Sequence, residues 1–202
     1  MTSKIISFIG MDGAGKTTLT NRLISELRKE GHKTKYIYSG KGRDNILPIQ
    51  FFGRRYVKNK KKKEKEKVGP DKNKISMLHT LAAPVFAFDL LLRYLFVILP
   101  NKVGNEFVIT DRYSTDILLM ARVPFGFKRF LYFFLPKPDK IFYIYHDLDV
   151  LNRRKPSHPY QDLKRQKVIF SKILKKIDYS PIKNEGVRES VERIKKELLN
   201  DR

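Results

Sequence analysis

The N-terminal part of the chain contains the feature that most constrains the fold. The segment Gly10-Met11-Asp12-Gly13-Ala14-Gly15-Lys16-Thr17 fits the pattern G-x-x-x-x-G-K-[ST] and follows the apolar run Ile5 to Ile9. In a strand, glycine loop and helix of this kind, backbone N–H groups and the positive helix end point at a polyphosphate. The alternative is an ordinary glycine-rich turn. The position of the loop directly after a strand favours phosphate binding.

The loop predicts a site for ATP and Mg²⁺. Lys16 would reach the β- and γ-phosphates, and the Thr17 hydroxyl would ligate the metal. Thr18 continues the helix. The residues expected to hold the nucleotide are Gly10, Asp12, Gly13, Ala14, Gly15, Lys16, Thr17 and Thr18.

The next segments predict an α/β fold. Apolar residues recur at helical spacing between Thr17 and Glu30, and Gly31 follows in a position typical of a helix end. The segment Lys33 to Tyr38 is typical of a strand, which completes a parallel, right-handed βαβ unit.

We predict one three-layer P-loop domain over residues 1–202, with helices on both faces of a five-stranded parallel sheet. The strands are expected near residues 4–9, 33–38, 106–110, 139–145 and 178–182. The strand ending at Thr110 must lie beside the strand ending at Ile9, because the metal site needs both ends.

The third expected strand delivers Asp111-Arg112-Tyr113 at its carboxyl end. An acidic residue in this place, here Asp111, holds the metal and its waters in P-loop proteins, and Arg112 can neutralise charge on a transferring phosphoryl group. The alternative is an Asp that caps a helix, followed by a surface arginine.

The chain is strongly basic, with a net charge of +22. Nine basic and two acidic side chains lie between Arg54 and Lys67, so an inserted, lysine-rich loop is expected at about 54–70. Such a charge can attract nucleotides, RNA or an anionic membrane, here through Lys58 to Lys67, or can serve solubility alone. Arg43 follows the second strand and is a candidate phosphate ligand or one more surface arginine.

Two apolar segments need an interpretation. The segment Ile75 to Leu99 predicts a helix that Pro84 kinks or divides, and the part after Pro84 is too short to span a membrane, so no transmembrane segment is expected. Asp89 and Arg93 stand four residues apart in it, as in a helix between core and solvent. The aromatic run Phe125 to Leu135 predicts a helix buried against the sheet or in a dimer face. Its alternative is a membrane-surface contact with Lys128 and Arg129 at headgroup depth.

The remaining composition excludes several site classes. The absence of cysteine excludes disulfides and thiolate metal sites, and the four histidines show no metal-ligand spacing. Because the first residues enter a strand directly, no secretory signal is expected, and the predicted compartment is the cytoplasm.

The sequence resembles the thymidylate kinase branch of the nucleoside monophosphate kinases. The glycine loop with Asp12 and Thr18 matches that branch, as does Val108-Ile-Thr-Asp-Arg-Tyr-Ser114. Further similar segments are Asp139 to Tyr145 (a strand), His146 to Arg154 (a short helix), Arg153 to Arg165 (a lid) and Ile182 to Ile194 (the last turn and helix).

The resemblance implies phosphoryl transfer from ATP to a nucleoside monophosphate, with thymidine monophosphate as first choice and other small-molecule acceptors behind it. The loop has no basic residue at Gly13 or Ala14, so the family pattern places a catalytic cation at Arg153, Arg154 or Arg165. It also implies that Asp12 lies near the acceptor sugar, that Arg43 and Arg112 bind its phosphate, and that Lys16 is catalytic. A homodimer is expected if the aromatic run Phe125 to Leu135 forms a dimer face.

The chain departs from the family where the base is recognised. An arginine and a phenylalanine are expected before the Asp-Arg-Tyr strand, but the chain has Leu81-Ala-Ala-Pro-Val-Phe-Ala-Phe88 there. An apolar slot of Leu81, Phe86 and Phe88 would discriminate weakly between pyrimidines. Three alternatives remain open: a kinase for a nucleic-acid 5′-hydroxyl, a kinase for a sugar or lipid at a membrane surface, and a non-catalytic, ATP-switched protein that binds RNA or membrane.

Overall fold

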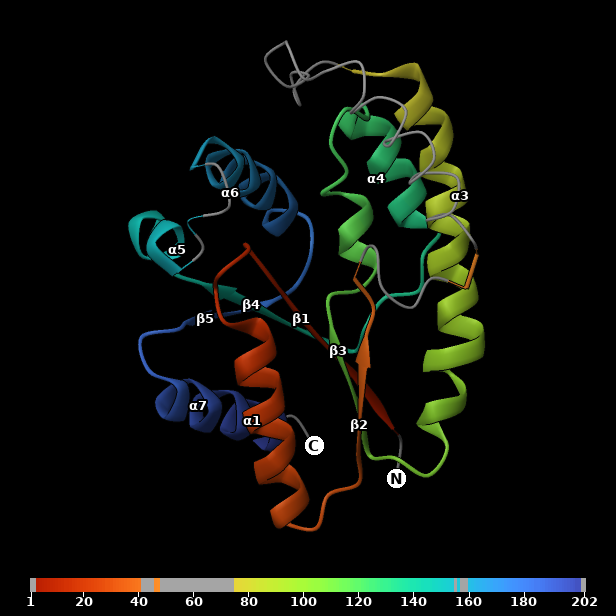
Figure 1. The fold of residues 1–202 in the computed structure, drawn as a ribbon. Helices are drawn as coiled ribbons and strands as arrows, with labels where there is room; N and C mark the ends of the chain where they lie inside the picture. Colours follow the sequence, from red (N-terminus) through yellow and green to blue (C-terminus); the bar gives the residue numbers. More distant parts are fainter. Residues whose placement is uncertain (1–2, 41–45, 48–74, 155, 157–159, 201–202) are drawn as a thin grey trace.

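The structure is a computed structural model that describes residues 3–40, 46–47, 75–154, 156 and 160–200 (Figure 1). Arg43 and the inserted segment 54–70, with Lys58 to Lys67, lie outside the described residues. Part of the expected lid at 153–165 does as well. What the sequence predicts for these segments stays a prediction.

A five-stranded parallel sheet forms the centre of the molecule, in the order β2-β3-β1-β4-β5. The strands are β1 (Lys4–Gly10), β2 (Thr34–Tyr38), β3 (Phe107–Asp111), β4 (Lys140–Tyr145) and β5 (Ser180–Lys183). β3 pairs with β1, so that Phe8 stands beside Asp111. This adjacency is what the predicted metal site requires, and the expected sheet is confirmed.

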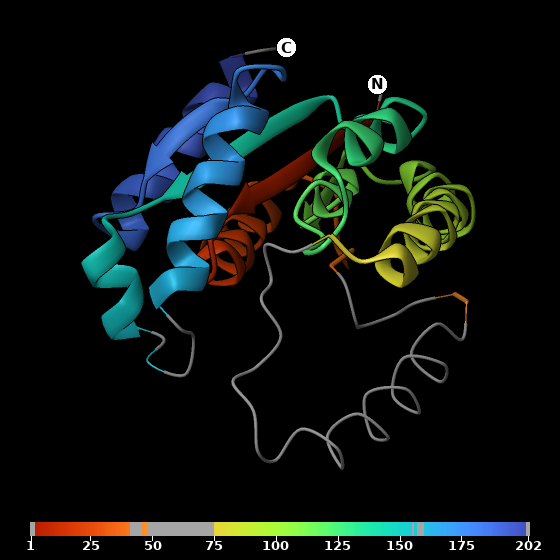
Figure 2. The same ribbon diagram turned by 90° about the horizontal axis from the view of Figure 1, so that it is seen from above.

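Helices cover both faces of the sheet (Figures 1 and 2). They are α1 (Lys16–Lys29), α3 (Met77–Arg93), α4 (Phe125–Phe133), α5 (Leu148–Arg154), α6 (Tyr160–Leu174) and α7 (Val187–Asn200). Shorter helical turns are η1 (Tyr94–Ile98), η2 (Pro100–Lys102) and η3 (Ser114–Ile117).

The buried strands explain why both faces need cover. Successive side chains of a strand point to opposite faces. Ile6 and Phe8 pack in one core cluster with residues of α1 and α7, whereas Ile5 packs in another with Ile98 of η1. Because both sides of β1 are apolar, the sheet is stable only between two helical layers.

The helix α3 runs unbroken through Pro84, so the expected division there is wrong. The helical stretch continues instead into a π-helical turn, η1. Asp89 and Arg93 also differ from expectation, since both are buried rather than placed between core and solvent. Their ion pair, with Nη2 to Oδ2 at 2.6 Å, compensates each charge for the loss of water.

The aromatic run forms α4, which packs on α3 and η3 rather than on the sheet. Lys128 is buried, whereas Phe130, Phe133 and Phe134 are exposed. The expectations of packing against the sheet and of Lys128 at headgroup depth are therefore wrong, whereas a dimer face and a membrane-surface contact of the exposed aromatic residues stay predictions.

One helical stretch, Met77–Lys102, is long and apolar enough to cross a membrane by length and composition. The sequence-based argument that this helix is too short is therefore wrong. Its packing decides against a membrane span: Ala83, Phe86 and Leu90 belong to a core cluster with η3 and α4, and the buried Arg93, paired with Asp89, donates to the Gly40 carbonyl after the end of β2. We interpret it as a core helix of the domain.

Candidate active site

The glycine loop connects β1 to α1 at the carboxyl edge of the sheet (Figure 1). Gly10 has a φ of 148° and lies so close to Ile144 that a Cβ would stand 2.1 Å from the Ile144 carbonyl oxygen. Gly15 has a φ of 90°, and its Cβ would stand 2.3 Å from the amide nitrogen of Asn184. These two positions require glycine, because neither the backbone conformation nor the space admits a side chain.

A cavity of about 620 Å³ lies over the loop. It brings together most of the residues that the sequence predicts for nucleotide and metal, while Gly10 and Ala14 lie beneath its surface. Its lining is formed by Asp12, Gly13, Gly15, Lys16, Thr17, Thr18, Tyr38, Asp111, Arg112, Arg154, Asn184, Glu185, Gly186 and Val187. The cavity therefore joins the loop with the ends of β2, β3 and β5.

Lys16 is folded back onto the glycine loop. Its Nζ donates to the carbonyl oxygens of Gly10 at 2.9 Å and Met11 at 2.8 Å, and the residue is buried. Burial, and then the positive charge of Arg112, lower its pKa from 10.5 to about 8. An anion in the cavity would stabilise the charged form and offer the ammonium group a better partner than two carbonyls.

Thr17 and Asp111 meet at the end of β3. The Thr17 hydroxyl donates to Asp111 Oδ2 at 2.5 Å. The other carboxylate oxygen, Asp111 Oδ1, is buried and has no hydrogen-bond partner among the described residues. A buried carboxylate oxygen without a donor leaves a place for a cation, so these residues fit the predicted Mg²⁺.

Arg112 lies between two carboxylates. Its guanidinium is hydrogen-bonded to Asp12 and stands 3.5 Å from Asp116 Oδ1. Burial opposes the charge, but these carboxylates outweigh it, so the pKa of Arg112 is raised. Its φ of 65° is in the left-handed region, which is uncommon for a non-glycine residue and is found often at functional sites. The backbone N–H of Arg112 donates to Phe8 at 3.0 Å, which fixes this turn to β1.

Two polar residues that the sequence does not single out also hold the loop. Gln166 of α6 donates through Nε2 to Asp12 Oδ2 at 3.0 Å and accepts from the Asp12 N–H at 3.1 Å. Asn184, in the turn after β5, donates to the Ala14 carbonyl at 2.8 Å. Asn184 lies in the last turn that resembles the family, and this resemblance is the one sequence signal that points to it. No sequence signal points to Gln166.

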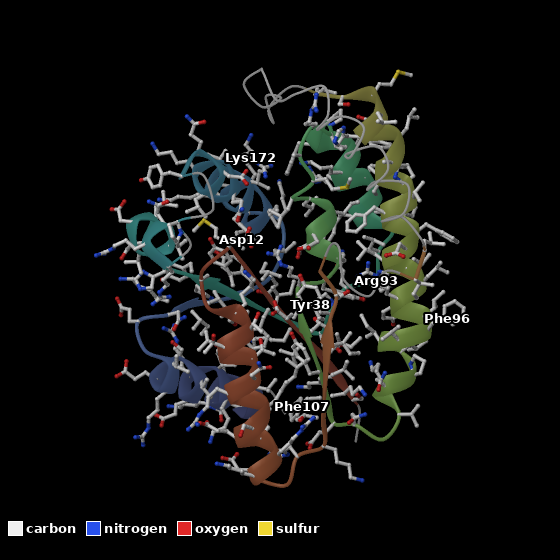
Figure 3. All side chains as sticks on the ribbon, viewed as in Figure 1. Asp12, Tyr38, Arg93, Phe96, Phe107 and Lys172 are labelled. Carbon is white, nitrogen blue, oxygen red and sulfur yellow. The ribbon has the colours of Figure 1, made fainter. Side chains whose placement is uncertain are left out.

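A second group of unpredicted residues supports the end of β2. Arg93 Nη1 donates to the Gly40 carbonyl at 3.2 Å, and Asp89 accepts from the Leu47 N–H at 2.8 Å. The side chain of Tyr38 lines the cavity beside Arg112 (Figure 3). The buried ion pair of α3 thus fixes the chain at one wall of the cavity.

The three candidate lid arginines do not lie together. Arg153 and Arg154, at the end of α5, are both exposed, but only Arg154 lines the cavity over the loop. Arg165 lies on α6, where its Nε contacts Asp162 at 3.0 Å, and it lines a different cavity. Of the three, Arg154 is the one that the described residues place beside Lys16.

The expected apolar slot is not formed. Phe86 is buried in the core beside η3, whereas Leu81 and Phe88 are exposed on the other side of α3. Residues 81 and 88 are two helical turns apart and share a face, while residue 86 points elsewhere, so the three cannot line one slot. That expectation is wrong.

Comparisons with known proteins find similarity in structure alone. No family model matches the sequence, and a search of curated proteins finds no match. The structure of thymidylate kinase from Candida albicans superimposes with a TM-score of 0.68 at 19% identity, over 99% of this chain and 92% of the other. Thymidylate kinase from Ehrlichia chaffeensis gives 0.61 at 18% identity, over 98% of this chain and all of the other. This chain therefore has the thymidylate kinase fold.

Proposed function

We propose that this protein is an ATP- and Mg²⁺-dependent kinase that phosphorylates a nucleoside monophosphate, with thymidine monophosphate as first choice. One observation carries the proposal: Lys16, Thr17, Asp111 and Arg112 line one cavity at the carboxyl edge of the sheet. These are the groups that phosphoryl transfer needs to bind a polyphosphate, a metal and a transferring phosphoryl group.

The metal would be held by the Thr17 hydroxyl and the Asp111 carboxylate, with phosphate oxygens and waters completing its coordination. A hydroxyl that donates to a carboxylate keeps lone pairs for a cation. When bound, Mg²⁺ would neutralise charge on the β- and γ-phosphates. Two protein ligands suit Mg²⁺, which usually retains several waters.

Lys16 and Arg112 would supply the protein's own charges. Lys16 would leave the carbonyls of Gly10 and Met11 and bind the β- and γ-phosphates. Arg112 is held by Asp12 and Asp116, so its guanidinium is oriented before the substrates bind. An oriented charge stabilises the transition state without reorganisation, which is the main source of catalysis in this reaction class.

The acceptor would lie beside Arg112 and Tyr38, at the end of β2. Arg112 would bind its phosphate and Asp12 would approach its sugar. The expected base-reading arginine is absent from the sequence, and α3 offers no apolar slot, so we propose shallow selectivity. The thymidylate kinase of Candida albicans is itself described as having broad substrate specificity.

An acceptor screen tests this function. ADP release from ATP is measured with and without a panel of nucleoside monophosphates, for wild type, Lys16→Ala and the exposed control Arg22→Ala. We expect acceptor-dependent ADP release that Lys16→Ala lowers at least about a hundredfold, because a loss of about 3 kcal/mol has that effect. Thymine and uracil monophosphates should differ by less than about a hundredfold, since one methyl group contributes about 1–3 kcal/mol.

The same screen separates the alternatives. Slow ADP release without any acceptor, together with salt-sensitive RNA binding, would contradict the kinase and favour an ATP-switched binding protein. Turnover that is lost when Lys58 to Lys67 are deleted would identify a polyanionic acceptor, such as a nucleic-acid 5′-hydroxyl. Steep selectivity for thymidine monophosphate would contradict the proposed shallow recognition.

A further inference from the structure

A second cavity of about 490 Å³ lies between α6 and the segment from η3 to α4. One wall is the face of α6 that carries Arg165, Val168 and Lys172, and the other is formed by Met120 to Lys128. The two walls approach each other at Phe125, whose ring centre is 6.0 Å from Lys172 Nζ. Lys172 is labelled in Figure 3, and Figure 2 shows α6 and α4 from above. We call this cavity the basic pocket.

The charge of the basic pocket is of one sign. Its lining includes the five cations Arg122, Lys128, Lys164, Arg165 and Lys172, and no acidic side chain among the described residues. Arg165 has a carboxylate partner, Asp162, which is not part of the lining. Arg122 has a buried Nε without a hydrogen-bond partner in the described part of the chain. The positive charges of these side chains repel one another, and an anion bound between them would remove that repulsion.

Of the five cations in the basic pocket, Lys128 is the one whose burial is hardest to explain by stability alone. It is 4% exposed in an otherwise apolar part of α4, and its Nζ donates to the Met120 carbonyl at 2.9 Å. Burial first, and then the charges of Arg165 and Lys172, lower its pKa to about 8. A lysine held in a cavity at this cost, without an ion-pair partner among the described residues, is a candidate for binding a ligand.

Apart from Gln161, the rest of the lining is apolar. Met120, Val123 and Phe125 lie on one wall, and Val168 and Ile169 lie on the other. Cations over an apolar floor suit a molecule that carries an anionic group on an apolar or aromatic body.

Both walls of the basic pocket continue along the chain into elements of the candidate active site. Arg165 precedes Gln166, which holds Asp12 of the glycine loop. On the opposite wall, Tyr113 connects Arg112 to η3, which leads to Met120. Both walls of the pocket are therefore joined by short stretches of chain to residues that position the glycine loop and Arg112.

We propose that the basic pocket binds a phosphate ester, with its anionic group on Lys128, Lys164 and Lys172 and its apolar body on Phe125. The phosphate has one of two sources: a second phosphate of the acceptor itself, or a separate phosphorylated molecule that binds beside it. A second phosphate on the acceptor rests on the proposed function. Binding of a phosphate to the pocket does not, because that binding is measured without turnover.

Calorimetric titration with inorganic pyrophosphate tests the proposal. The full chain is first saturated with a non-hydrolysable ATP analogue, so that the glycine loop is filled. The test variant carries Lys164→Gln and Lys172→Gln, both at exposed positions, and the matched control is Lys167→Gln, an exposed lysine of the same helix outside the pocket. We expect the double variant to bind at least about tenfold more weakly and the control to bind like wild type.

Two results would overturn the proposal: no binding of pyrophosphate to the saturated wild type, or equal affinity in all three proteins. Thermal melts check that each variant is folded. The source of the phosphate follows from a second arm, in which thymidine 3′,5′-bisphosphate is compared with thymidine 5′-monophosphate. Tighter binding of the bisphosphate that pyrophosphate competes away supports a second phosphate on the acceptor. Pyrophosphate binding that leaves the affinity for both nucleotides unchanged supports a separate molecule.

Discussion

The buried state of Lys16 makes ATP binding depend on pH. In the free protein its pKa is lowered to about 8, so above that pH the side chain is mostly neutral. The polyphosphate of ATP favours the charged form and raises the pKa again. Binding above pH 8 must therefore take up a proton, and the affinity for ATP falls as the pH rises.

The size of the expected change in ATP affinity follows from the shift in the pKa of Lys16. The difference between the ordinary pKa of 10.5 and about 8 corresponds to about 3 kcal/mol, which the phosphates restore if they return the pKa of Lys16 to its ordinary value. At pH 9 about one Lys16 in ten carries a charge, so ATP should bind about tenfold more weakly than at pH 7. The loss can reach a few hundredfold at higher pH. The phosphates do not add to this change, because they are already ionised above pH 7.5.

Calorimetry provides the assay. The affinity for a non-hydrolysable ATP analogue is measured from pH 7.5 to 9.5, and two buffers with different ionisation enthalpies give the number of protons taken up. We expect the uptake of about a quarter of a proton at pH 7.5 and of close to one proton at pH 9. Lys16→Arg is the control, because arginine stays protonated over this range.

An affinity that stays flat from pH 7.5 to 9.5 would refute this reasoning. So would an equal fall in Lys16→Arg, because the titrating group would then be another one, such as Lys128, whose pKa is also lowered to about 8.

Three further predictions follow from the same cavity. Arg112→Ala should lower kcat at least about a hundredfold while the protein stays folded, because an oriented transition-state charge is lost; wild-type turnover at saturating acceptor would contradict its role. Arg154→Gln should lower kcat more than it weakens ATP binding, whereas Arg153→Gln should leave both nearly unchanged, since only Arg154 lines the cavity; steady-state kinetics of both variants checks this, and equal effects would place Arg153 in the site as well. Asn184→Ala should lower the free energy of unfolding by about 1–3 kcal/mol, because the Ala14 carbonyl loses a buried donor at 2.8 Å; urea titration measures it, and an unchanged midpoint would show that water replaces the amide.

The fold could be predicted because its signals are local. The strand, glycine loop and helix at Gly10 to Lys16 follow one another directly, and the spacing of the loop requires that order. The acidic end of β3 is local as well, because Asp111 closes an apolar strand. Parallel βαβ connections then leave few topologies, so the strands lie within two residues of their expected bounds.

Which side of an apolar helix is buried could not be predicted from the sequence, for a physical reason. Composition shows that a helix such as α4 needs burial but not which side is buried. Lys128 is inside and Phe133 outside because α4 meets α3 and η3 at a particular rotation. The same holds for Phe86 and Phe88, which are two residues apart and lie on different faces of α3. Rotation about a helix axis depends on the neighbouring elements, which the sequence of one segment does not contain.

By itself, the sequence determined the sheet, the glycine loop and the chemistry at the end of β3, since each depends on neighbouring residues and on backbone geometry that permits few alternatives. Only the tertiary structure decided which distant groups complete the site. Gln166 reaches Asp12 across 154 positions of the chain and Asn184 reaches Ala14 across 170. Arg154, rather than Arg153 or Arg165, lies at the cavity, and five cations share the basic pocket. These contacts depend on how helices pack against the sheet, because packing sets which side chains of remote segments face each other.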